Sequence, residues 1–144
     1  MAVALLDASF VAVLCLVSLA DLRTRQLPDG PLLAGLVLAI GVGGVADPVT
    51  LPARLVAALA AAGFLLAAAL IRPDGMGLGD VKLAGMLGAY LGTRVIEALL
   101  VAFAAGSVAG LALIVRHGWS ARTRTIPFAP FLALGALVAA APQP

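Results

Sequence analysis

The sequence GMGLGDVKLAGMLGAYLG, residues 75 to 92, places Asp80 between glycines at the start of an apolar segment. The whole chain is similarly apolar. Of its 144 residues, 63% are hydrophobic and 11% are charged, and the mean hydropathy is +1.16. A soluble domain of this size usually carries about 25% charged residues. The composition therefore predicts an all-α polytopic membrane protein, and we expect residues 1–144 to form a single membrane-embedded domain.

Six apolar segments follow one another along the chain, separated by short polar stretches. We expect about six transmembrane helices, at residues 3–20, 31–46, 55–71, 81–91, 95–115 and 126–141. A helix needs about 20 residues, and roughly 17 at least, to cross a bilayer. The second, fourth and sixth segments are shorter than that. We therefore expect residues 77–80 to sink below the surface in a non-helical conformation and complete the fourth span.

The distribution of Lys and Arg predicts the orientation of these helices. With six spans, most of the basic residues fall on the connections after the first, third and fifth spans: Arg23, Arg25, Arg72, Lys82, Arg116, Arg122 and Arg124. Only Arg54 and Arg94 fall on the opposite side. Cytoplasmic loops carry the excess of Lys and Arg in membrane proteins. We therefore expect the connections at 21–30, 72–82 and 116–125 to face the cytoplasm and both termini to face outside.

Several classes of protein are disfavoured by the same composition. The net charge of +2 and the lack of a basic stripe with interleaved aromatic residues argue against nucleic-acid binding. A signal peptide would begin with a basic region, but residues 1–20 contain no Lys or Arg, so we expect a retained first span. Cys15 and His117 are single residues of their types, and no set of ligands has metal spacing. We expect no metal and no cofactor.

Two carboxylates lie where chemistry could occur. Asp21 directly follows the first apolar segment and Asp80 directly precedes the fourth, so both are expected at the cytoplasmic edge of the bilayer. Two carboxyl groups that meet in a low-dielectric cleft share a proton, as in aspartic proteases. Spacing alone leaves other interpretations open. Asp80 could be a helix N-cap, and Asp21 could be an interfacial residue paired with Arg23 or Arg25.

Three motifs resemble those of the type IV prepilin peptidases. The sequence DLRTRQLPD, residues 21–29, resembles a first motif in which an aspartate ends a membrane helix and precedes basic residues and a hydrophobic-Pro-Asn/Asp turn. GLGDVKL, residues 77–83, matches the GxGD signature shared with presenilin-type proteases and its prepilin form GxGDxKL. IPFAPFLALG, residues 126–135, resembles the closing IPFxPFLxxG segment. The order of the motifs over most of the chain makes the resemblance specific.

The resemblance implies a membrane aspartic endopeptidase that removes the basic leader peptide from prepilin or pseudopilin precursors. Cleavage would occur at the cytoplasmic face of the bacterial inner membrane, and the partners would be prepilin-like substrates and the lipid bilayer. By position in the motifs, Asp21 and Asp80 would be the catalytic pair. Many members of the family also methylate the new N-terminus through an extension with paired CxxC motifs. This chain starts at the first span and has one cysteine, so we expect a peptidase without methyltransferase activity.

Other residues of the motifs are expected to line or support the cleft: Gly77, Gly79, Lys82, Pro28 and Asp29. The glycines would let a substrate strand approach closely. Asp29 precedes Gly30-Pro31, which indicates a helix start, so its expected role is in a turn. Lys82 is expected to extend to the bilayer surface, where it would meet water or acidic lipid.

Two other functions remain open at this point. One is a GxGD protease for other membrane substrates, of the preflagellin or presenilin-like type. The other is a small proton-coupled transporter in which Asp21 and Asp80 form a proton relay. The closing IPFxPF segment and Lys82 favour the prepilin type. A transporter would place its carboxylates near the midplane of the bilayer, whereas both aspartates are expected at its edge.

Overall fold

The computed structural model describes residues 2–73, 76–118 and 126–141, and these residues are almost entirely helical. The helices are α1 (Ala2–Thr24), α2 (Asp29–Ala46), α3 (Leu51–Ile71), α4 (Leu78–Leu91), the short 3-10 helix η1 (Gly92–Arg94), α5 (Val95–His117) and α6 (Ala129–Ala140). No strand occurs within the described ranges. The prediction of an all-helical chain is therefore confirmed.

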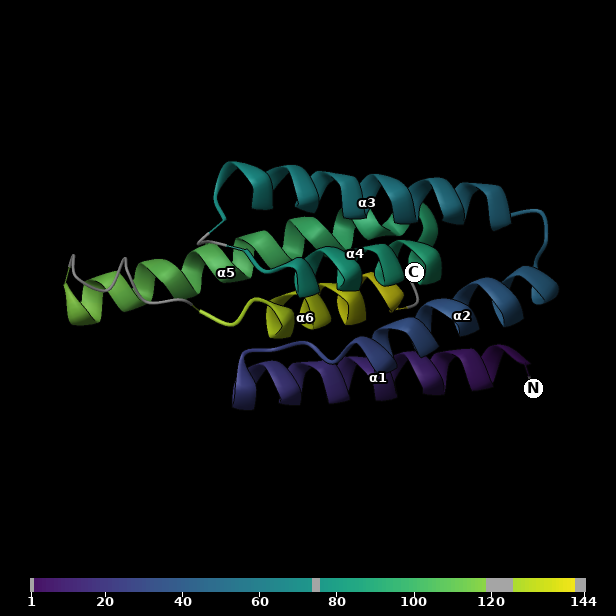
Figure 1. Ribbon diagram of the computed structural model, residues 1–144, viewed down its shortest axis with the longest axis horizontal. Coiled ribbons are helices and arrows are strands. Elements are labelled where there is room, and N and C mark those ends of the chain that lie inside the picture. Colours follow the sequence, from purple (N-terminus) through teal and green to yellow (C-terminus); the bar gives the residue numbers. More distant parts are fainter. Residues whose placement is uncertain (1, 74–75, 119–125, 142–144) are drawn as a thin grey trace.

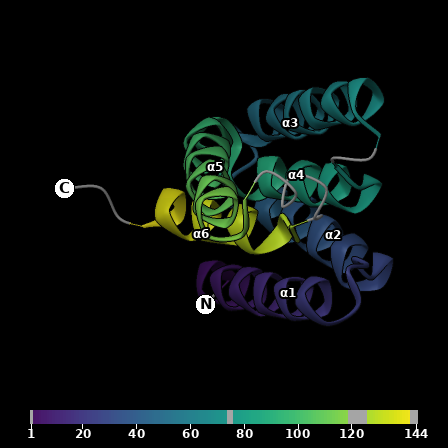
Figure 2. The same ribbon diagram turned by 90° about the vertical axis from the view of Figure 1, so that its left-hand side faces the viewer.

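Consecutive helices run in alternate directions along the long axis of the molecule (Figure 1). Helix α3 packs against α4, α5 against α6 and α1 against α2, and α4 also contacts α2 and α6 (Figure 2). As a result, the ends of α1, α3 and α5 lie together with the starts of α2, α4 and α6. The connections at 21–30, 72–82 and 116–125, which we expected on one side of the membrane, therefore begin and end at the same end of the molecule. Part of the last connection, including Arg122 and Arg124, lies outside the described residues.

Among the residues that the structure describes, three helical stretches are long and apolar enough to cross a membrane: residues 29–46, 51–71 and 78–117. The third stretch contains α4, η1 and α5, and the chain reverses its direction inside it (Figure 1). Gly92 has φ 59°, a conformation that glycine adopts without steric cost, and it begins this reversal. Helix α6, with 12 residues, is apolar but shorter than a usual span. The count of six spans stays a prediction.

The start of α4 corrects one expectation. The helix begins at Leu78, so Asp80 lies inside its first turn and is neither its N-cap nor part of a non-helical stretch. Gly77 is the N-cap, with extended backbone, and its carbonyl oxygen accepts a hydrogen bond from the Asp80 N–H at 3.1 Å. A carboxylate is favourable near the positive end of a helix, which explains why the helix starts before the apolar segment does.

Two glycines allow the helices around the site to approach closely. A Cβ atom at Gly88 of α4 would lie 2.5 Å from the Cα atom of Ala58 on α3. A Cβ atom at Gly135 of α6 would overlap the carbonyl oxygen of Ala98 on α5. Small residues at such positions are the usual basis of helix packing in lipid. The two close pairs, α3 with α4 and α5 with α6, fix the framework from which the site residues project.

Candidate active site

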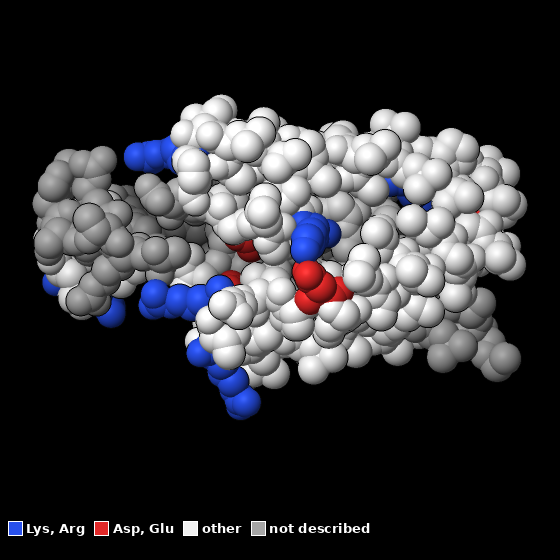
Figure 3. All heavy atoms as spheres, viewed as in Figure 1, with Lys and Arg blue, Asp and Glu red and all other residues white. Residues whose placement is uncertain are grey.

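A cavity of about 510 Å³ lies where the three motifs come together. Its lining combines the end of α1 and the following loop, the start of α4, and the segment that precedes α6. Figure 3 shows acidic side chains inside and beside a hollow in this face of the molecule. A second cavity, of about 670 Å³ between α3 and α5, is lined by no ionisable side chain. The first cavity is therefore the one equipped for acid–base chemistry.

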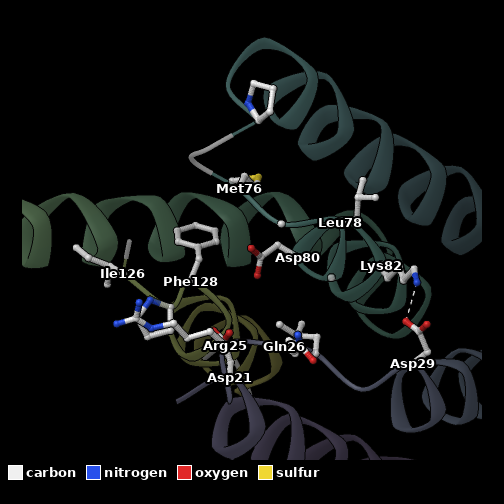
Figure 4. A pocket seen from close by; sticks show the side chains of 15 residues that line it. Asp21, Arg25, Gln26, Asp29, Met76, Leu78, Asp80, Lys82, Ile126 and Phe128 are labelled. Carbon is white, nitrogen blue, oxygen red and sulfur yellow. Dashed lines mark hydrogen bonds and ion pairs between the residues drawn. The ribbon is translucent and has the colours of Figure 1, made fainter. Parts of the chain in front are cut away.

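Asp21 and Asp80 meet in this cavity from different helices. Asp21 lies on the last turn of α1 and is 4% exposed, and Asp80 lies on the first turn of α4 and is 7% exposed. Figure 4 shows their carboxyl groups turned toward the same space. They are close enough for their charges to repel one another. They are also the buried charged residues of the described chain, which sets them apart from the other four acidic residues that the structure describes.

Asp21 is held by the start of α6. The backbone N–H of Ala129, the first residue of that helix, donates a hydrogen bond to Oδ2 of Asp21 at 3.1 Å. Burial raises the pKa of Asp21 above its ordinary value, and the hydrogen bond from Ala129 and the positive charge of Arg25 oppose that rise. Both opposing interactions favour the ionised carboxylate. The sequence gives Asp21 a partner more than a hundred positions away, which no local spacing predicted.

Asp80 has a different environment. Its Oδ1 atom is buried and has no hydrogen-bond partner within the described ranges. A buried carboxyl oxygen that lacks a partner costs about 1–3 kcal/mol or more, depending on its charge. This atom lines the cavity with Asp21, so it is placed to bind a water molecule or a polar group of a substrate.

Gly77 and Gly79 of the GLGDVKL motif have structural roles at the start of α4. A Cβ atom at Gly79 would lie 2.8 Å from the Cβ atom of Leu27, so Gly79 lets the α1–α2 loop pack against the start of α4. Gly77 caps α4, and Pro28, with φ −70° and ψ 128°, caps α2. Access for a substrate strand, the role first expected of Gly77 and Gly79, stays a prediction. Their observed contacts show how the loop that follows Asp21 is brought to the helix that carries Asp80.

Lys82 has a partner that the sequence did not indicate, and its extension to the bilayer surface stays a prediction. Its Nζ atom donates a hydrogen bond to Oδ1 of Asp29 at 2.6 Å, forming an ion pair at the edge of the cavity (Figure 4). The two side chains are 53% and 62% exposed. Asp29 is the first residue of α2, as its place before Gly30-Pro31 indicated. The pair therefore connects α4 to α2, and sequence spacing could not show it because the two residues are 53 positions apart.

Several cavity residues carry no recognisable signal on their own: Arg25, Gln26, Met76, Ile126 and Phe128. Only Arg25 has an unusual backbone, with φ 52° after the end of α1. The prolines that flank Ala129 were a usable signal, because proline is favoured in the first turn of a helix. They mark where α6 begins, and hence which N–H groups are free to reach Asp21. Within the described ranges, no group of three or more His, Cys, Asp or Glu residues could hold a metal ion.

The chain is thus an all-helical protein with helices apolar enough to cross a membrane, and it carries two buried carboxyl groups in one cavity. The model of the type IV leader peptidase family matches residues 8–115, and the chain belongs to this family. Its membership and its apolar helices make it a multi-pass membrane protein. No solved structure gives a significant match to the chain.

Three relatives illustrate the similarity, and each is named prepilin leader peptidase/N-methyltransferase. The protein from Xanthomonas campestris is 32% identical over 82% of this chain and 43% of its own length. The protein from Burkholderia pseudomallei (strain 1026b) is 35% identical over 86% of this chain and 42% of its own length. The Bacillus subtilis protein is 30% identical over 90% and 52%, respectively. The chain thus spans about half the length of these curated relatives.

Proposed function

We propose that this protein is a membrane aspartic endopeptidase that removes the leader peptide from prepilin-like precursors. The observation that carries the proposal is the meeting of Asp21 and Asp80, both buried, in one cavity. Family membership and the names of the relatives support it. The proposal covers cleavage of the leader and leaves aside the N-methyltransferase activity in those names.

The pair supplies the groups that peptide hydrolysis needs. One carboxylate removes a proton from a water molecule, and the water oxygen attacks the carbonyl carbon of the scissile bond. The other carboxyl group, which is protonated, donates a hydrogen bond to the carbonyl oxygen and stabilises the charge that develops there. Neither a thiol, a hydroxyl nucleophile nor a metal ion takes part in this scheme. Both carboxyl groups are buried, which strengthens these electrostatic interactions.

The site faces the cytoplasm in this proposal. Most described basic residues lie on the helix ends and connections around the cavity: Arg23, Arg25, Arg72, Lys82 and Arg116. Arg54 and Arg94 lie near the opposite ends of their helices. Because cytoplasmic loops carry the positive excess, six spans with both termini outside give the observed asymmetry. In a bacterium this corresponds to the inner membrane, with the substrate's leader on the cytoplasmic side.

The alternative functions are less well supported. A proton relay through the membrane needs ionisable groups at intermediate depth. The residues that line the cavity instead belong to the end of α1, the start of α4 and the segment before α6, which lie together toward one end of the bundle (Figure 1). Cleavage of other membrane substrates uses the same chemistry, so only the choice of substrate separates it from prepilin processing. The names of the relatives favour prepilins.

Conservative substitutions of the pair test the proposal. Asp21→Asn and Asp80→Asn keep the size of each side chain but remove its ability to exchange a proton. We expect each to lower cleavage of a leader-bearing prepilin by about 100-fold or more. Asp47→Asn, at the far end of α2, is the matched control and should cleave normally. Mass spectrometry of the products and the membrane content of each variant are measured together. Full activity in either pair variant, with normal amounts of protein, contradicts the proposal.

A further inference from the structure

The two carboxyl groups of the pair are not equivalent. Oδ2 of Asp21 accepts a hydrogen bond from Ala129, whereas Oδ1 of Asp80 is buried and has no partner in the part of the chain that the structure describes. Both side chains are more than nine-tenths buried, so the difference does not come from unequal access to solvent. The amide at the start of α6 and the charge of Arg25 stabilise Asp21 as an anion, whereas burial and the charge of Asp21 outweigh the Gly77 N–H that favours the Asp80 anion.

The N–H of Ala129 is available because of its position in that helix. The first four N–H groups of an α-helix have no partner within the helix. Ala129 is the first residue of α6, the N-cap Phe128 makes no side-chain capping bond, and Pro127 and Pro130 have no N–H. Ala129 is 0% exposed, so water does not readily replace an acceptor there. Asp21 therefore satisfies a buried donor at the positive end of a helix, which favours its ionised form.

Asp80 has the opposite preference. Its Oδ1 atom is buried without a partner, and an ionised Asp21 opposes a second negative charge nearby. Together these outweigh the backbone N–H of Gly77, which favours the Asp80 anion. When two close carboxyl groups cannot both ionise, the pair retains one proton. The proton stays on the member whose anion is less well stabilised. From these contacts that member is Asp80.

We propose that the start of α6 assigns the two roles in the pair, with the Ala129 amide holding Asp21 as the general base and leaving the shared proton on Asp80. The proposal rests on the peptidase function proposed above. Ala129 is a positioning residue in it, since its amide acts only through Asp21.

The assignment gives a balanced reaction. Asp21 takes a proton from water while the water oxygen bonds to the carbonyl carbon, and Asp80 gives its proton to the carbonyl oxygen. The product of this step is a neutral gem-diol. When it collapses, the C–N bond breaks, Asp21 passes its proton to the leaving nitrogen, and Asp80 recovers a proton from a diol hydroxyl. The products are a carboxylic acid and an amine, and the pair returns to its starting state.

An amide-to-ester substitution tests the donor without changing a side chain. Incorporation of lactic acid at position 129 of the full chain replaces the N–H with an oxygen atom. The lost bond to a charged group should reduce kcat/KM about tenfold or more. Without its donor the pKa of Asp21 rises further, so the acidic limb of the pH profile should move to higher pH.

Phenyllactic acid at position 131 is the matched control, because the Phe131 N–H donates to the carbonyl oxygen of Phe128 at the same helix start. An acidic limb that does not move in the position-129 ester, or that moves equally in the control, overturns the proposal.

Chemical labelling tests the assignment without a substrate. A diazo reagent converts a protonated carboxyl group into an ester and releases nitrogen gas, whereas an ionised carboxylate lacks the required proton. Mass spectrometry of protein labelled at mildly acidic pH should find the ester on Asp80, with Asp21 modified only in the position-129 ester variant. Preferential labelling of Asp21 in the unmodified protein overturns the assignment. Because labelling needs no cleavage, a protein that labels as expected but cuts no prepilin would instead contradict the peptidase function.

Discussion

Arg25 has a conformation that is unfavourable for its residue type. Its φ of 52° is a left-handed conformation that costs an L-residue roughly 1–2 kcal/mol. Glycine or asparagine usually occupies this position after a helix end. The turn is closed by the Arg25 N–H, which donates to the carbonyl oxygen of Asp21 at 2.9 Å. The arginine side chain then lines the cavity, so the unfavourable backbone coincides with a positive charge beside the pair.

Removing this charge should change the pH dependence of cleavage. Arg25 lowers the pKa of Asp21, so Arg25→Met should raise it. If Asp21 must be ionised to act as the base, the acidic limb of the kcat/KM profile moves to higher pH. Activity is then lost most strongly at the acidic end and least at the alkaline end. Kinetics of the purified protein across a pH series measure this shift.

Arg23→Met is the control for that experiment. Arg23 is exposed on the last turn of α1 and does not line the cavity. The same loss of charge there should leave the limb in place. Equal shifts in both variants would mean that the general positive charge at this end of the molecule, rather than the contact of Arg25 with the pair, controls the ionisation.

The ion pair of Lys82 and Asp29 should contribute little despite its short distance. Both side chains are more than half exposed, and exposed pairs are worth about 0.2–1 kcal/mol. Lys82→Gln and Asp29→Asn should therefore each reduce kcat/KM by less than about fivefold. High salt should diminish even that difference, because it screens exposed charges. Measurements at low and high salt check this. A loss as large as that in Asp21→Asn would show that the pair acts directly in the reaction.

At the scale of residues, the sequence was enough to select the two carboxyl groups of the site, but it predicted few of the contacts that they and their neighbours make. Asp21 and Asp80 could be selected because an ionisable residue beside an apolar segment is rare enough to stand out. The contact of Lys82 with Asp29 depends on the packing of α4 against α2, which no spacing specifies. The Ala129 donor is a backbone group, and every residue except proline has one. Only the place where α6 begins distinguishes it, and that start was expected at residue 126 instead of 129.

At the scale of elements, Gly88 and Gly135 can be distinguished from glycines that merely occupy a helix. Adding a Cβ atom at either position creates a contact with backbone that cannot move without displacing a neighbouring helix. Gly88→Ala and Gly135→Ala should each destabilise the fold by about 1–3 kcal/mol. Gly63 of α3 has nothing within 4 Å of such an atom. Gly63→Ala should be neutral or stabilising by up to about 1 kcal/mol, because alanine favours the helix.

Thermal unfolding of the three variants in detergent, followed by circular dichroism, compares them. Gly88 and Gly106 each begin a GxxxG sequence, a spacing that lets helices pack closely in lipid. Gly106 faces the side chain of Phe128, which can shift more readily than backbone. Gly106→Ala should therefore cost less than Gly88→Ala. The reverse order would show that the aromatic contact beside the site is the more rigid one.

The helices themselves were predictable, and their ends were less so. Each of the six apolar segments corresponds to one α-helix, because apolar side chains and internal backbone hydrogen bonds are both required in lipid. Helices α2, α3 and α4 begin two to four residues before the apolar segments, at Asp29, Leu51 and Leu78. Acidic residues or a proline occupy these first turns, where they are stabilising even though they are not apolar. Hydropathy alone misses such turns.

At the scale of the whole molecule, charge and cavity lie at the same end. The connections after α1 and α3 and the end of α5 carry most of the described basic residues, and the carboxyl pair lies among them. The opposite end has Arg54 and Arg94. One arrangement therefore serves two purposes. It orients the protein in the membrane, and it exposes the pair to the side on which an uncleaved leader would remain.

Cysteine labelling tests this orientation. The variants Thr24→Cys and Val49→Cys are made in a Cys15→Ala background, so that the introduced cysteine is the one thiol in each variant. Thr24 ends α1 beside the cavity, whereas Val49 is 86% exposed between α2 and α3 at the other end. One crossing separates the two positions if α2 spans the membrane, as its length of 18 residues and its hydropathy allow. A thiol reagent that cannot enter intact cells should modify position 49 and leave position 24 unmodified until the membrane is opened. Modification of position 24 from outside would reverse the orientation, and it would place the carboxyl pair on the wrong side for a cytoplasmic leader. Modification of both positions from outside would exclude α2 as a span and reduce the number of crossings below six.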